Sequence, residues 1–185
     1  MEKNPHHLVL GELSDFLTGE KRIDTHDERY RQSISKHLVL TLGYEKKDIC
    51  QNEVVTLKVG NQKARMKVDF LISEGDRTCM LIKYAPGSLV TRRLSNLALS
   101  RVVRPYQIPV VVTTNGEDAE IINGPTGNLT GQGLDGIPSK RELEKIKRSV
   151  SFSVISESLH EKASRIAYAC EVDGACPCDS DVCVV

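Results

Sequence analysis

The feature that most constrains the fold is a group of three short segments that are predicted to pair as consecutive β-strands. Apolar side chains alternate with polar ones in residues 55–59 and again in residues 66–72. Gly60-Asn61 lies between these two segments, and a second glycine turn leads into a third segment, residues 79–84. A period of two with turn residues at both junctions is typical of antiparallel strands joined by tight turns. The chain is therefore predicted to contain a three-stranded meander.

Helical and buried segments flank the predicted meander. Asp24 or Thr25 is predicted to cap a helix over residues 27–42, because apolar residues recur there at every fourth position. A second helix is predicted over residues 94–103. The apolar run in residues 108–112 that follows does not alternate, and this is typical of a strand covered on both faces.

The sequence divides into four parts. We predict an N-terminal arm in residues 1–24, an α/β domain in residues 25–150, a C-terminal helix in residues 151–170 and a cysteine-rich tail in residues 171–185. Inside the domain, residues 123–138 contain five glycines and are predicted to form a long surface loop. The order of helix, meander, helix and buried strand predicts an α/β fold with a mixed central sheet flanked by helices.

The charge balance limits what the chain can bind. Lys plus Arg and Asp plus Glu are equal at 25 each, so the formal net charge is +0. Any nucleic-acid-binding surface must then be a local cluster of basic residues. No apolar run approaches the roughly 20 residues that a membrane span requires, so we expect no membrane contact and a cytoplasmic location. The sequence does not predict an oligomeric state.

Asp69 and Lys83 are the pair best suited to carry chemistry. Asp69 follows Val68 on the second strand, and the turn register places it opposite Ile82 or Lys83 on the third. Facing residues have Cβ atoms about 5 Å apart, so the two charged groups can share one site. An Asp that binds a divalent cation, beside a Lys that orients the attacking water, is suited to phosphodiester hydrolysis. From spacing alone, the commoner interpretation is a surface ion pair across a hairpin.

Five short segments, in this order and at this spacing, resemble one family. They are Asp27-Glu28-Arg29-Tyr30-Arg31-Gln32, Gly43-Tyr44, Val68-Asp69-Phe70-Leu71-Ile72, Met80-Leu81-Ile82-Lys83-Tyr84-Ala85-Pro86 and Pro109-Val110-Val111-Val112-Thr113-Thr114-Asn115-Gly116. Over residues 25–125 the chain resembles the N-terminal domain of the restriction subunits of type I restriction enzymes, which belongs to the PD-(D/E)xK nuclease superfamily. The resemblance implies a restriction-endonuclease-like core and Mg²⁺-dependent DNA cleavage. It makes Asp69 a catalytic residue and metal ligand and Lys83 a catalytic residue, and the backbone carbonyl of Ile82 is a candidate second ligand.

The chain departs from the family pattern at the second acid. The pattern has an acid two positions before the Lys, where this sequence has Leu81, which offers no ligand to a cation. Glu28 on the first helix is the candidate to replace that acid. Two functions of different classes therefore stay open. One is a Mg²⁺-dependent DNA endonuclease, and the other is a non-catalytic module that binds nucleic acid or a protein partner.

Two more groups of residues have both a functional and an ordinary interpretation. Arginines around the second helix are candidates to contact DNA phosphates, or else form a solvated helix face. They are Arg92, Arg93, Arg101 and Arg104. Cysteines in the tail are candidates to hold Zn²⁺ or an iron–sulfur cluster, or else are spare thiols of a disordered tail. They are Cys170, Cys176, Cys178 and Cys183.

Overall fold

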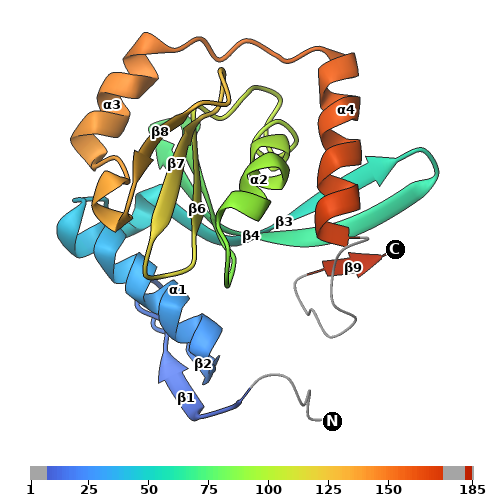
Figure 1. The fold of residues 1–185 in the computed structure, drawn as a ribbon. Helices are drawn as coiled ribbons and strands as arrows, with labels where there is room; N and C mark the ends of the chain where they lie inside the picture. The colour runs from blue at the N-terminus through green and yellow to red at the C-terminus, as the bar shows by residue number, and fades with distance from the viewer. Residues whose placement is uncertain (1–7, 173–181, 185) are drawn as a thin grey trace.

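The computed structural model describes residues 8–172 and 182–184, which form a mixed α/β fold (Figure 1). Its strands are β1 (Gly11–Ser14), β2 (Lys21–Asp24), β3 (Ile49–Val59), β4 (Gln62–Glu74), β5 (Arg77–Tyr84), β6 (Val110–Thr114), β7 (Ala119–Asn123), β8 (Leu129–Gln132) and β9 (Val182–Val184). Its α-helices are α1 (His26–Lys36), α2 (Arg93–Leu99), α3 (Lys140–Ser149) and α4 (Glu157–Ala167). None of the helices in these ranges is both long and apolar enough to span a membrane.

The central sheet has the mixed character that the sequence predicts. Its strand order is β3-β4-β5-β6-β7-β8, and β9 pairs with β4 outside this path. Strands β3, β4 and β5 form the predicted antiparallel meander, whereas β5 and β6 are parallel and are connected through α2. The predicted α/β fold is therefore confirmed.

Helices cover both faces of this sheet, and each face has its own apolar cluster. The first cluster contains Ile34 of α1, Leu38 of the helical segment His37–Thr41 that directly follows α1, and Leu143 of α3. The second contains Leu99 of α2 and Ala167 of α4. Helices α1 and α3 thus lie on one face, with α2 and α4 on the other (Figure 1).

Strand β4 pairs with β5 along only part of its length, and the point where the two strands separate is a fork. From Phe70 onward β4 pairs with β5, whereas residues 64–66 pair with β9 on that side. The alternation in residues 66–72 predicts that Val68 and Phe70 face the same core, but Val68 belongs to the second cluster and Phe70 to the first. The switch of face coincides with a local irregularity of the hairpin, since Asn52, which lies between the paired residues Gln51 and Glu53, has a left-handed φ of 56°. Asp69 sits at this point.

Two expectations about local structure were wrong, and one region has structure that was not predicted. The N-terminal arm contains a hairpin of β1 and β2, which the sequence did not predict. The segment 123–138 contains β8 instead of being only a loop. The second helix ends at Leu99, because the bonds that follow from Arg101 and Val102 reach back only three residues before Pro105 stops the chain. The strands β1, β2 and β8 are short, and pairing with a neighbouring strand stabilises such strands more than their local propensity does.

Candidate functional site

Asp69 occupies the fork where β4 separates from β5. The carboxylate is buried, with 3% of the residue exposed. Its Oδ2 accepts a hydrogen bond from the backbone N–H of Tyr84 at 2.9 Å. Beyond the pair formed by Phe70 and Ile82 the β4–β5 ladder stops, so this carboxylate satisfies a strand N–H that has lost its backbone partner. Asp69 therefore has a structural role in the sheet as well as a place in a site.

Lys83 reaches the same fork from β5. Its Nζ donates to the carbonyl oxygen of Lys67 at 2.9 Å and lies 3.5 Å from Oδ2 of Asp69. Only 8% of Lys83 is exposed, so this is a largely buried ion pair and not the surface pair that spacing alone favours. The structure thus brings Asp69 and Lys83 together as the turn register predicts.

Arg31 of α1 is the third member of the site, and the sequence did not single it out for this role. Its Nε donates to Oδ1 of Asp69 at 2.7 Å, and its guanidinium lies over the ring of Tyr84, 5.2 Å from the ring centre. A buried carboxylate between Arg31 and Lys83 forms a cluster with a formal charge of +1. We call Arg31, Asp69 and Lys83 the fork cluster.

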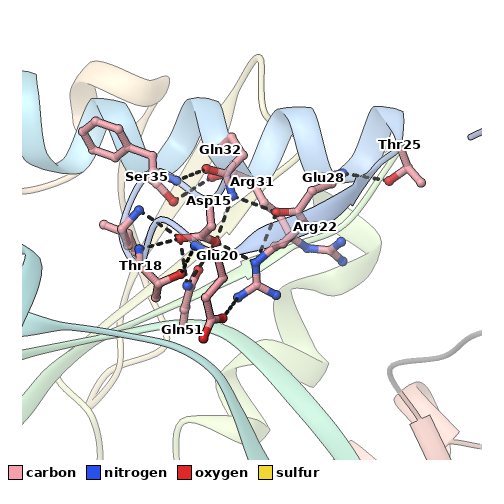
Figure 2. A network of polar contacts seen from close by, with 12 residues as sticks. Asp15, Thr18, Glu20, Arg22, Thr25, Glu28, Arg31, Gln32, Ser35 and Gln51 are labelled. Carbon is pink, nitrogen blue, oxygen red and sulfur yellow. Dashed lines mark hydrogen bonds and ion pairs between the residues drawn. The ribbon is translucent and has the colours of Figure 1, made fainter. Parts of the chain in front are cut away.

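Glu28, the candidate replacement acid, points into a different network (Figure 2). Its Oε1 accepts from Nε2 of Gln32 at 2.7 Å and lies 4.0 Å from Nε of Arg22. In the described part of the chain, no hydrogen bond or ion pair joins Glu28 to Asp69. The structure therefore does not unite the three predicted catalytic residues.

The centre of that network is Asp15, which joins the N-terminal hairpin to α1 and β3 (Figure 2). The carboxylate is 2% exposed and accepts from the backbone N–H of Thr18, Nε2 of Gln32, Nε2 of Gln51 and Nε of Arg22. Burial acts to raise the pKa of Asp15, but these donors outweigh it and lower the pKa to about 2. The ionised Asp15 carboxylate therefore links the N-terminal hairpin to α1 and β3 through hydrogen bonds.

The residues at the fork do not fit a hard divalent cation. Such a cation takes about six oxygen ligands. Leu81 is fully buried in the second apolar cluster, and both oxygens of Asp69 already accept N–H groups. Within residues 8–172, no group of three or more His, Cys, Asp or Glu side chains is placed to hold a metal ion. The Ile82 carbonyl could add one neutral oxygen, and water could add more, but the positive charges of Arg31 and Lys83 leave the site without the net negative charge that anchors such an ion.

The four arginines around α2 are largely engaged inside the protein. Arg93 forms a two-pronged contact with Glu120, with both N–O distances 2.5 Å, and Arg104 contacts Glu53 at 2.5 Å and 2.9 Å. The remaining contacts are Arg101 Nε with Gln107 Oε1 at 2.7 Å and Arg92 Nη1 with Glu171 Oε1 at 3.7 Å. Because carboxylates already balance three of these charges, this group is poorly suited to hold phosphates.

The tail cysteines fall largely beyond what the structure describes. Cys170 is exposed and lies within the helical segment Tyr168–Val172 that continues α4. Cys176 and Cys178 lie outside the described residues, and only the backbone of Cys183, in β9, is described. The metal site predicted for the tail stays a prediction.

A basic surface that the sequence analysis overlooked lies on the hairpin of β3 and β4. Ala64, Met66 and Val68 pack into the second cluster with α4, so the side chains between them point to the opposite face. That face carries the exposed Lys63 and Arg65. Together with Lys58, which pairs with Lys63, and the half-buried Lys67, these residues form what we call the basic face.

The basic face is continuous with the fork cluster. Lys67 belongs to this face, and its carbonyl oxygen accepts the hydrogen bond from Lys83. Among the described residues, Lys58, Lys63 and Arg65 form no ion pair. The alternation of Lys63, Arg65 and Lys67 is visible in the sequence, but it becomes meaningful only when the face covered by α4 is known.

Comparison with known protein families agrees with the resemblance seen in the sequence. The model of the type I restriction enzyme R protein N terminus matches residues 26–138, from α1 to the segment after β8. The chain belongs to this family. No curated protein and no solved structure shows a significant match to the chain. All three residues of the fork cluster lie inside the matched range.

Proposed function

We propose that this member of the type I restriction enzyme R protein N-terminal family binds double-stranded DNA without cleaving it, through the basic face and the adjoining fork cluster. The observation that carries the proposal is the row of cations on one face of the β3–β4 hairpin. Lys58, Lys63 and Arg65 are exposed and form no ion pair within the described part of the chain, and such groups release counterions when they meet phosphates. The family supports DNA as the polyanion, because restriction enzymes act on DNA.

The spacing of the basic face suits a phosphate backbone. Cross-strand partners such as Lys58 and Lys63 stand side by side, and positions two apart on a strand lie roughly 7 Å from each other. Phosphates along one DNA strand are separated by a similar length, so neighbouring cations can contact successive phosphates. Such contacts carry little sequence information, and we expect binding that depends strongly on salt and weakly on sequence.

Cleavage is the second candidate, and the short distance between Asp69 and Lys83 favours it. Leu81 and the engaged oxygens of Asp69 oppose it, because they leave too few ligands for the cation that hydrolysis needs. A plasmid assay with Mg²⁺ or Mn²⁺ separates the two candidates. We expect equal background nicking by the wild type and Asp69→Asn, whereas nicking that only the wild type performs would establish the nuclease in place of the binding module.

Binding is tested by fluorescence anisotropy with a labelled duplex across a range of salt concentrations. We expect the double charge reversal Lys63→Glu with Arg65→Glu to remove two phosphate contacts. The slope of log K against log salt should then fall by about 0.9 for each lost contact. Affinity at low salt should fall at least roughly tenfold, since the new carboxylates also repel the phosphates.

The matched control is Arg141→Glu with Lys145→Glu on α3. Both residues are exposed, and Figure 1 shows α3 at the opposite side of the molecule from the tip of the β3–β4 hairpin. This variant has the same net charge as the first, so a difference between the two isolates the basic face from general electrostatics. Equal affinity of the two variants, or no DNA binding by the wild type, contradicts the proposal.

A further inference from the structure

We infer that the guanidinium of Arg31 takes the place of a divalent cation at Asp69, so that the fork cluster is a permanently metal-independent site. The inference goes beyond DNA binding and holds whether or not DNA is bound. It rests on the contacts of the fork cluster and on how Arg31 is held in position. A variant that reverses the charge of Arg31 tests it.

Both oxygens of Asp69 already accept hydrogen bonds, and two cationic side chains lie against them. Oδ1 accepts from Arg31 at 2.7 Å, and Oδ2 accepts from the Tyr84 N–H at 2.9 Å with Lys83 Nζ 3.5 Å away. A divalent ion at Asp69 would have to compete with the charge-assisted hydrogen bond from Arg31 and stay close to two positive charges. In a largely buried site that repulsion is only weakly screened. Binding of Mg²⁺ or Mn²⁺ by the wild type is therefore unfavourable.

Arg31 is held in position by its own helix and by Tyr84. The ring of Tyr84 lies under the guanidinium and stacks on Tyr30, with ring centres 6.0 Å apart. The Tyr84 hydroxyl donates to Oδ1 of Asp27 at 3.0 Å. Burial and the charge of Asp27 raise the pKa of Tyr84, so the phenol stays a neutral donor. The aromatic support orients Arg31 before any ligand arrives.

A single substitution should reverse the arrangement. In Arg31→Glu, a carboxylate oxygen can occupy the position of the Arg31 Nε, because both atoms are the fourth heavy atom after Cα. Two carboxylates would then stand within hydrogen-bond distance in a mostly buried place, and like charges so close require a cation or a proton between them. With Lys83 still in place, we expect Arg31→Glu to bind about one Mn²⁺ per chain.

The experiment measures Mn²⁺ binding by electron paramagnetic resonance and by the shift of the melting temperature, without DNA. We expect no binding by the wild type, binding with a rise in melting temperature for Arg31→Glu, and no binding by the isosteric neutral control Arg31→Gln. The double variant Arg31→Glu with Asp69→Asn should lose the site. Should Arg31→Glu be unfolded without metal, its refolding on addition of Mn²⁺ is the supporting result.

Two outcomes overturn the inference. One is stoichiometric Mn²⁺ binding by the wild type that disappears in Asp69→Asn, which would show that Arg31 yields to a cation. The other is equal Mn²⁺ binding by Arg31→Glu and Arg31→Gln. Because DNA is absent from the measurement, failure here is distinguishable from failure of the DNA-binding proposal.

Discussion

Replacing Asp15 by Asn should weaken the attachment of the N-terminal hairpin and change how stability depends on pH. The Asp15 carboxylate joins β1–β2 to α1 through Gln32 and to β3 through Gln51, and it is paired with Arg22. An amide removes the charge and turns one acceptor into a donor that faces other donors. The substitution therefore breaks several hydrogen bonds while keeping the size of the side chain.

The contribution of the Asp15 charge to the free energy of unfolding follows from the pKa of Asp15. This pKa falls from 3.8 to about 2 on folding, and each pKa unit corresponds to about 1.4 kcal/mol, so the ionised form contributes roughly 2 kcal/mol to the free energy of unfolding. Because the folded-state pKa is the lower one, this contribution is present above about pH 4. It is lost progressively as the pH falls toward about 2. Acid should therefore destabilise the wild type more steeply than Asp15→Asn over that interval.

Urea denaturation of the two proteins at several pH values between neutral and about pH 2 tests this prediction. We expect Asp15→Asn to be less stable at pH 7 by about 2 kcal/mol or more, and the gap to narrow in acid. The exposed Asp135→Asn serves as the control and should leave the curve unchanged. A stability gap for Asp15→Asn that stays constant from pH 7 to about pH 2 would refute the reasoning.

Three more substitutions or reactions test other parts of the structure. Leu81→Glu would supply the acid of the family pattern but bury it among apolar side chains, so we expect a loss of several kcal/mol in urea denaturation. Ser139→Ala removes the capping box of α3, in which Ser139 and Glu142 bond reciprocally, and should cost about 1 kcal/mol. Burial raises the pKa of Cys79 to about 11, so its thiol should resist iodoacetamide at neutral pH until urea unfolds the protein, as mass spectrometry would show.

Local patterns account for the parts of the fold that were predicted. The meander follows from alternation and turn residues between Val55 and Tyr84, which need no knowledge of distant segments. The same turn register brought Asp69 and Lys83 together. The start of α3 at Ser139 also follows from a local pattern, the capping box.

Distant packing accounts for the parts that were not predicted. Arg31 meets Asp69 only because α1 lies on the first face of the sheet, and the helical period alone does not say which side chain faces the fork. Likewise, Glu28 shares a face with Gln32 and is drawn into the network of Asp15. The basic face escaped notice because α4, far along the chain, decides which side of the hairpin is covered.

The pairing of β9 with β4 has a consequence for the protein before it is fully folded. The β4 edge at residues 64–66 is covered by residues that follow much later in the chain, at 182–184. Until that cover docks, the hairpin presents unpaired backbone groups, which are a template for a strand from another molecule. Lys63 and Arg65 beside this edge repel the same edge of a second copy. Lys63 and Arg65, which we propose to contact DNA, would thus also reduce self-association of the chain during folding.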